Sequence, residues 1–354
     1  PVLAAAIDRH VVIAIREDPI QVGVRADFAD IPGEFAHVLP DLAHDWRNPG
    51  QSTASGDYLR GAIAALQTRG QAVRTGLELV VAGDLPYGVG ISSSAALCVA
   101  LVLALARETP APSEVVLIAQ EAEHRAGSPC GTMDQSASVY GGLIRYEGAD
   151  NSVRTIAADL AGHQFVVVNS GVVRTLAGSA YPERVRETQA ALAILQGRWR
   201  EDLPALGAIA SADLVAALAV LESAGAAKLV NRVRHVVTEG QRVRDAERAI
   251  AGSDWAEVGR LMTASGHSSA SDYDMSHPQV ERVVSLCLDV PGVLGARMMG
   301  GGQGGSALVL ARSESVDALR DRLDRDYFNE LRNPPGVRMI PCTFAPGAGP
   351  MEPA

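Results

Sequence analysis

The chain has 354 residues, 47% of them hydrophobic, and a net charge of −10. This length makes two domains the default expectation, and the acidic balance argues against nucleic acid and anionic membrane surfaces as partners. The longest purely apolar segment, residues 95–106, is shorter than the ~20 residues that span a bilayer.

The first part of the chain alternates between strand and helix patterns. β-branched runs predict strands at residues 10–18, 20–26, 77–85, 141–148 and 163–172. Helical periodicity predicts helices at residues 56–68, 94–107 and 112–126, the last opened by Pro112. We expect the seam between two domains at residues 149–162, and therefore place the domains at 1–158 and 159–354.

The second part begins with long amphipathic stretches and ends with alternating helix and strand patterns. Helices are predicted at residues 181–197, 211–251, 278–289 and 313–332, and strands at 295–299, 306–311 and 337–345. Residues 347–354 are expected to form a frayed tail. The cysteines lie far apart with no CxxC pair, which indicates reduced thiols rather than a disulfide framework or a zinc site. No signal peptide pattern opens the chain, so we expect a cytoplasmic protein.

The stretch "DLPYGVGISSSAAL", residues 84–97, joins a predicted strand to a buried helix. Gly88 and Gly90 allow backbone amides to turn towards a ligand. Ser92, Ser93 and Ser94 fall at the first helical turn, where free N–H groups and the helix dipole favour an anion. The stretch therefore predicts a phosphate-binding loop. The alternative is a serine N-cap, which needs only one serine. A Walker A loop is excluded, because its Lys-Ser/Thr ending is absent.

A second stretch, "AQEAEHRAGSPCGTMDQ" at residues 119–135, runs from a predicted helix carrying Glu121 and Glu123 to Asp134. A carboxylate in partly apolar surroundings can act as the base for a hydroxyl group. Asp134 also precedes a possible helix, so helix capping is the competing interpretation.

The third stretch, "RMMGGGQGGSALVLA" at residues 297–311, contains a literal G-x-G-x-x-G. A Rossmann glycine loop opens a helix, whereas an apolar strand follows here. We interpret it as a strand–loop–strand whose bare backbone approaches a ligand or another loop. A Cβ at Gly302 should then block ligand binding and leave the melting temperature nearly unchanged.

Together these stretches resemble the GHMP small-molecule kinases, and among them the galactokinases. "PYGVGISSSAAL" is similar to the second family motif and "GGGQGGSA" to the third, while "AEHRAGSPCGTMDQ" resembles the galactokinase segment around the catalytic aspartate. "SAYPERVRE" (179–187) and "SSASDYDMSHPQVERVV" (268–284) also match galactokinase stretches, so the resemblance covers nearly the whole chain.

The resemblance implies an α+β, two-domain GHMP kinase fold. Its N-terminal domain would be like ribosomal protein S5 domain 2, and its C-terminal domain would be ferredoxin-like. It also implies ATP and Mg²⁺ as cofactors. Carried over by position, Asp134 is the base for the sugar C1 hydroxyl, Ser94 and Glu123 bind magnesium, and Gly131 and Tyr181 contact the sugar. The glycine-rich loop near the substrates comprises Gly300, Gly301, Gly302, Gly304 and Gly305.

Two positions depart from the family pattern. An RVNLIGEHTDY-like first motif normally precedes "VLxxAIDR", which is residues 2–9 here. We therefore expect either a fragment, which Pro1 in place of an initiator Met favours, or a protein without these groups. In the adenine-side W-x-x-Y pattern, Tyr58 is kept, but Ser55 takes the Trp position.

The resulting hypothesis is a galactokinase-like sugar-1-kinase with a sugar and ATP as its small-molecule partners, monomeric or weakly dimeric. The alternatives are a non-catalytic sugar and ATP sensor, or a kinase for L-arabinose, N-acetylgalactosamine or a heptose.

Overall fold

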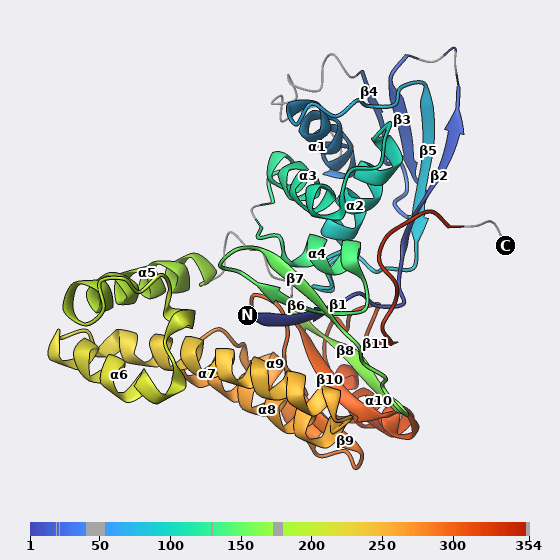
Figure 1. Ribbon diagram of the computed structural model, residues 1–354. Coiled ribbons are helices and arrows are strands. Elements are labelled where there is room, and N and C mark those ends of the chain that lie inside the picture. The colour runs from blue at the N-terminus through green and yellow to red at the C-terminus, as the bar shows by residue number, and fades with distance from the viewer. Residues whose placement is uncertain (19, 21, 40–53, 129, 173–179, 352–354) are drawn as a thin grey trace. The chain divides into compact units, whose positions relative to one another are not determined.

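The computed structural model (Figure 1) describes residues 1–18, 20, 22–39, 54–128, 130–172 and 180–351. The chain divides into two units. The N-terminal unit comprises Leu3–Tyr87, Ser92–Ile156 and Phe344–Ala354, and the C-terminal unit comprises Pro1–Val2, Gly88–Ile91 and Ala157–Thr343. Each unit is therefore assembled from separate stretches of the sequence. The predicted division at residues 158 and 159 stays a prediction.

A four-stranded sheet forms one layer of the N-terminal unit, in the order β2-β5-β3-β4. Its strands are β2 (Val11–Glu17), β5 (Leu77–Gly83), β3 (Val24–Phe28) and β4 (Phe35–Val38). β3 and β5 run parallel, and the other pairs are antiparallel. Alternate residues such as Leu77, Leu79 and Val81 are buried, as the period of two in a half-covered strand requires.

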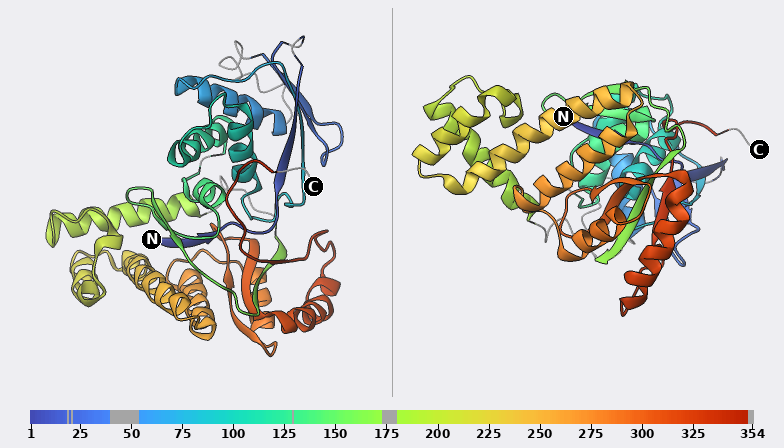
Figure 2. Two further views of the ribbon diagram at one scale, coloured as in Figure 1. Left: turned by 45° about the vertical axis from the view of Figure 1, so that its right-hand side comes forward. Right: turned by 90° about the horizontal axis from the view of Figure 1, so that it is seen from below.

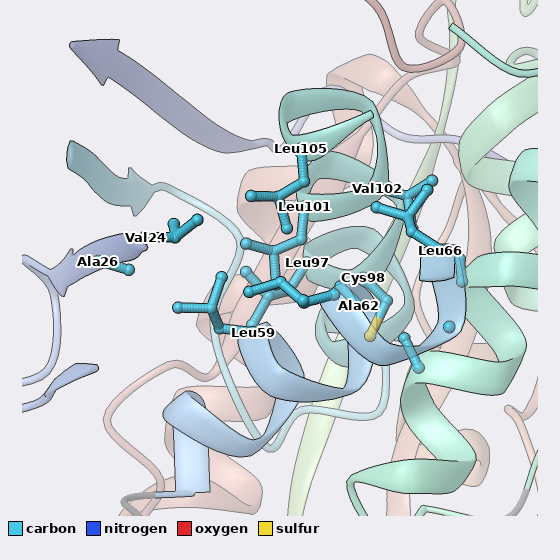
Figure 3. Packing of buried hydrophobic residues seen from close by; sticks show 14 of the residues in the cluster. Val24, Ala26, Leu59, Ala62, Leu66, Leu97, Cys98, Leu101, Val102 and Leu105 are labelled. Carbon is cyan, nitrogen blue, oxygen red and sulfur yellow. The ribbon is translucent and has the colours of Figure 1, made fainter. Parts of the chain in front are cut away.

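Helices α1 (Ala54–Thr68) and α2 (Ser93–Leu105) pack against that sheet, and α3 (Pro112–Arg125) packs against these two helices. Figure 3 shows side chains of α1 and α2 meeting in this core opposite strand β3; those it labels are Val24, Ala26, Leu59, Ala62, Leu66, Leu97, Cys98, Leu101, Val102 and Leu105. α2 is apolar nearly all round because α1, α3 and the sheet enclose it, which fixes the position of its first turn.

A second, three-stranded sheet consists of β1 (Val2–Ala5), β6 (Leu143–Glu147) and β7 (Ser152–Ile156), with α4 (Met133–Tyr140) packed on β6. The segment after residue 343 returns to this region. Ala345 N donates to Ala6 O (3.0 Å), Gly142 N donates to Ala345 O (2.7 Å) and Ala348 N donates to Ser138 O (2.8 Å). The predicted frayed tail at residues 347–354 is therefore wrong at Ala348, whose N–H is paired.

The C-terminal unit is built on a four-stranded antiparallel sheet in the order β11-β8-β10-β9. Its strands are β11 (Met339–Cys342), β8 (His163–Val172), β10 (Gly305–Arg312) and β9 (Val293–Met298). Helices α8 (Trp255–Ser271), α9 (Pro278–Leu288) and α10 (Val316–Asp326) lie beside these strands. The predicted helix at 313–332 is shorter in the structure, because 3₁₀ turns at Ser313–Ser315 and Phe328–Glu330 flank α10.

A separate apolar cluster joins α5 (Tyr181–Arg198), α6 (Leu214–Ser223) and the first half of α7 (Ala227–Ala251), to one side of that sheet (Figure 2). Short 3₁₀ turns at Leu206–Ala208 and Ser211–Asp213 connect α5 to α6. The long amphipathic stretch at 211–251 forms two helices, because Gly225 takes a φ of 74° between α6 and α7. Glycine is the usual residue where a helix ends in this left-handed conformation.

Candidate active site

The loop between β5 and α2 alternates in backbone conformation. Gly88 and Gly90 have φ of 75° and 81° and Ser92 has φ of 61°, whereas Val89 and Ile91 have negative φ. Such alternation points successive amide N–H groups towards one concavity, which is how nests bind anions. Ser92 is the informative member, because a side chain is strained at positive φ and strain of this kind concentrates at functional sites.

The three serines follow at the start of α2. Ser93 and Ser94 form its first turn, and Ser92 holds the N-cap position without a side-chain capping bond. Capping therefore does not account for the serine run. The first amides of an α-helix have no intrahelical acceptor, and the dipole makes this end attractive to anions. The helix start therefore offers donors to phosphate oxygens.

Glu123, near the end of α3, is the centre of a buried polar cluster and is only 3% exposed. Its carboxylate accepts hydrogen bonds from Gln135 Nε2, from Cys130 Sγ at 3.6 Å and from the Ser94 hydroxyl. The first turns of α2 and α4 thus meet the end of α3 at one carboxylate. This meeting brings together Ser94 and Glu123, the two residues that the sequence assigned to magnesium.

The electrostatics of the cluster are unusual for a structural carboxylate. Burial raises the pKa of Glu123, and the nearby Asp134 carboxylate raises it further, although the three hydrogen bonds oppose the shift. Burial also raises the pKa of the Cys130 thiol to about 12, so this thiol remains a protonated donor rather than a nucleophile. A cation between Glu123 and Asp134 would relieve the repulsion between the two carboxylates.

Asp134 is the second residue of α4, and Thr132 holds the N-cap position. Asp134 is therefore not the capping residue; its half-buried charge lies in the first turn, where the helix dipole favours an anion. Its electrostatic interactions with Glu123 and Cys130 place it in the same cluster. Gly131, just before the helix, is exposed, with no atom within 4 Å of where a Cβ would lie.

The structure adds members that the sequence interpretation did not assign to this site. Gln135 is fully buried, and its Oε1 has no hydrogen-bond partner among the described residues. The Tyr58 hydroxyl lies 3.5 Å from Ser128 Oγ and also bonds with Ser94. Tyr58 was noted only for its family pattern, and the signal for Gln135 was its place directly after Asp134. Ser55, at the Trp position of that pattern, is buried and donates its N–H to Glu34 at 3.2 Å.

The glycine-rich loop connects β9 to β10, as the strand–loop–strand interpretation predicts. Gly302, Gly304 and Gly305 are buried, whereas Gly300 is exposed and Gly301 is half-buried. A Cβ at Gly302 would lie 1.9 Å from Met275 O, which accepts from Gln303 N at 2.6 Å. The expectation that a Cβ at Gly302 would leave stability nearly unchanged is therefore wrong, because protein backbone fills that space.

The predicted site residues fall in two groups. Ser92, Ser93, Ser94, Glu123, Gly131 and Asp134 belong to the N-terminal unit, whereas Gly88, Gly90 and the glycine-rich loop belong to the C-terminal unit. Tyr181 begins α5 in the C-terminal unit, but its side chain lies outside the described residues.

Metal-binding groups and membrane-spanning helices are both absent from the described residues. Within them, no three or more His, Cys, Asp or Glu side chains gather as a metal-binding group. None of the helices described here combines the length and the apolar character needed to cross a membrane.

Two family models match the chain. The model of the GHMP kinases N terminal domain matches residues 57–142, and that of the GHMP kinases C terminal matches residues 246–330. The chain is 33% identical to the galactokinase of Roseiflexus sp. (strain RS-1), over 92% of this chain and 82% of that protein. It is also 33% identical to the galactokinase of Chloroflexus aggregans, over 98% of this chain and 87% of that protein.

Solved structures also match the chain. The crystal structure of Lactococcus lactis galactokinase complexed with galactose matches with a TM-score of 0.83 and 25% identity, covering 98% of this chain and 88% of that one. Mevalonate kinase of L. major in complex with R-mevalonate matches with a TM-score of 0.63 and 20% identity, covering 98% and 90%, which shows the fold alone. The predicted two-domain α+β fold and the family resemblance are confirmed.

Proposed function

Because this chain belongs to the galactokinase family of the GHMP kinases, we propose that it transfers the γ-phosphoryl group of ATP to the C1 hydroxyl of galactose or a related aldose. The observation that carries the proposal is the polar cluster around Glu123, near the end of α3, which Ser94 joins from the start of α2 and Asp134 from the start of α4. Phosphoryl transfer requires this combination of positioned anion donors, a cation site and a base.

The triphosphate would lie over the loop and the first turn of α2. Amides of residues 88–94 would donate to its oxygens, and the serine hydroxyls would add side-chain donors. Gly300 and Gly301, the exposed and half-buried members of the glycine-rich loop, are the ones with backbone available to a ligand.

Mg²⁺ fits the residues at Ser94 and Glu123, because both offer oxygen, which this hard cation prefers. Magnesium is usually held by one or two carboxylates together with substrate phosphates, so a pair of protein ligands suffices. When bound, the cation would neutralise charge on the phosphates. A cation here would oppose the effect of burial, which raises the pKa of Glu123, because a nearby cation favours the ionised carboxylate.

Asp134 would accept the proton of the C1 hydroxyl. The hydroxyl oxygen then forms a bond to the γ-phosphorus while the bond from that phosphorus to the β,γ-bridging oxygen breaks, and ADP leaves with the electron pair. A base held by a helix backbone can be kept within hydrogen-bond reach of one hydroxyl, which is the geometry that general-base catalysis requires. Gly131 and Tyr181 are proposed to contact the sugar, on the family resemblance.

The test is ATP-dependent phosphorylation of a sugar panel by the full-length protein, with ADP release and sugar 1-phosphate measured separately. The panel contains galactose, L-arabinose, N-acetylgalactosamine and a heptose. We expect stoichiometric ADP and sugar 1-phosphate with at least one aldose. Sugar and ATP binding by calorimetry without any ADP would contradict catalysis and would favour the sensor alternative.

A further inference from the structure

The predicted phosphate loop at residues 88–92 is held by a hydrogen bond from a strand of the C-terminal unit. Ser306 Oγ, at the start of β10, donates a hydrogen bond to the backbone carbonyl of Val89 at 2.6 Å. Ser306 is 1% exposed and Val89 is 3% exposed, so water does not compete for this bond. Both residues belong to the C-terminal unit. Ser306 thus holds the residue between the left-handed Gly88 and Gly90.

The carbonyl of Val89 has a strong requirement for this donor. A buried backbone carbonyl costs free energy when unpaired, because it has given up water. The two glycines beside it have few conformational restrictions of their own, since they lack a Cβ. The bond to Ser306 therefore selects one backbone arrangement from the many that a glycine-rich loop can adopt.

Ser306 is itself fixed by buried hydrogen bonds on the same sheet. Its carbonyl accepts from Met299 N at 2.9 Å, which ties it to the start of the glycine-rich loop. The preceding carbonyl, Gly305 O, accepts from Ser170 Oγ of β8 at 2.6 Å, and Ser170 O accepts from the Tyr327 hydroxyl at 2.7 Å. The Ser306 hydroxyl that bonds to the loop is therefore held in place by the buried hydrogen bonds of the C-terminal sheet.

We propose that Ser306 is a positioning residue for the nucleotide. Its bond to Val89 holds the alternating φ of residues 88–92, and hence the direction of the amides that would meet the triphosphate. The inference rests on the proposed function for its effect on ATP. The effect on the loop itself does not depend on that function.

The first experiment is steady-state kinetics of Ser306→Ala. Loss of the bond should raise KM for MgATP by roughly 10-fold, the size expected for one buried hydrogen bond, and leave KM for the sugar nearly unchanged. Ser306→Thr keeps the hydroxyl and should restore much of the ATP affinity. Thr238→Val is the control, because it deletes a partly buried hydroxyl-to-carbonyl bond, from Thr238 Oγ1 to Arg234 O at 2.8 Å, within α7 of the same unit. Equal losses of ATP affinity in Ser306→Ala and Thr238→Val would overturn the proposal.

The second experiment separates this inference from the proposed function. Amide hydrogen exchange of peptides covering residues 86–95 should accelerate several-fold in Ser306→Ala and stay near wild type in Thr238→Val. If the wild-type protein phosphorylates no sugar, the proposed function fails, but the exchange measurement still decides the role of Ser306. Unchanged exchange in a folded Ser306→Ala variant would overturn it.

Discussion

Asp134 lies in the first turn of α4, where its position does not depend on a flexible loop. Replacing it with Asn keeps the size of the side chain and removes the base. We expect Asp134→Asn to keep the fold and MgATP binding and to lower kcat by ~10²–10⁴-fold. Single-turnover phosphorylation together with calorimetric titration of MgATP measures both. Exposed Asp321→Asn is the control, and near-normal turnover in Asp134→Asn would refute proton abstraction by this residue.

Ser94 and Ser93 are neighbours in the first turn of α2, but only the Ser94 hydroxyl is recorded as a bond to Glu123. Ser94→Ala should therefore raise the Mg²⁺ concentration needed for half-maximal rate and weaken ATP, with little change in sugar affinity. Ser93→Ala is the matched variant and should shift the magnesium titration less. Identical magnesium titrations of both variants and the wild type would show that neither serine binds the metal, and that Glu123 and the phosphates are its ligands.

At the scale of one connection, the loop between β9 and β10 contains glycines in two different settings. Gly302 has φ of 74° and no room beside Met275 O, whereas Gly301 has negative φ and is half-buried. Gly302→Val should lower the melting temperature by several degrees as well as activity. Gly301→Ala should retain stability and weaken ATP or sugar binding. Thermal unfolding beside KM values separates these effects, and normal kinetics in Gly301→Ala would remove that residue from the site.

Helices α7 and α8 enclose a histidine that should make stability depend on pH. His235 stacks on Tyr273, with ring centroids 4.3 Å apart, and its Nδ1 lies 2.9 Å from Ser268 Oγ. Burial lowers its pKa to about 4, and Arg297 assists, although Glu239 opposes. Between this value and the unfolded value of about 6.5, only the unfolded chain binds the proton. The stabilisation is therefore complete above pH 6.5 and is lost as the pH falls towards 4.

Urea unfolding at pH 7.0 and pH 4.5 measures this dependence. His235 should account for up to ~3 kcal/mol of the fall in unfolding free energy. His235→Gln should flatten the dependence, whereas His10→Gln, a substitution of a histidine whose side chain is half exposed, should leave it unchanged. An equally steep pH dependence in His235→Gln would show that other groups produce it.

The same scale shows what the sequence could predict and what it could not. β8 was predicted with its observed bounds, because a β-branched apolar run ends sharply on both sides. α8 was not predicted, because glycines and serines interrupt its apolar pattern. The structure gives the reason: a Cβ at Gly259 would lie 2.3 Å from Leu294 O, so close packing on β9 dictates the glycine. Such packing is tertiary information that a local pattern does not contain.

The candidate site likewise has features that the sequence predicted and features that it did not. The glycine and serine pattern predicted a phosphate loop directly, because the required backbone conformations restrict the residue types. The local pattern around Asp134 left a base and a helix cap as alternatives, and the family resemblance favoured the base. The resemblance alone assigned Glu123 to magnesium. The bond between Ser306 and Val89 joins positions far apart in sequence, and nothing in either local stretch indicates it.

At the scale of the whole molecule, the segment after residue 343 supports the helix that carries Asp134. Its backbone pairs with Ala6, Ser138 and Gly142, and a Cβ at Gly347 would lie 2.1 Å from Val139 O. A chain that stops at Thr343 should lose several degrees of melting temperature and show faster amide exchange in α4. A chain that stops at Met351 is the control. Unchanged exchange in α4 after the longer truncation would show that the pairing contributes little.

The pairing of Ile7 with Phe344 also governs the order in which the protein can be completed during synthesis. A ribosome adds roughly 5–20 residues per second, so the segment around Ile7 waits for tens of seconds before its partner is made. The N-terminal unit therefore cannot finish folding on the nascent chain until nearly all of the C-terminal unit has emerged. During that interval the carbonyl of Ala6 and the N–H of Gly142 lack their native partner, Ala345.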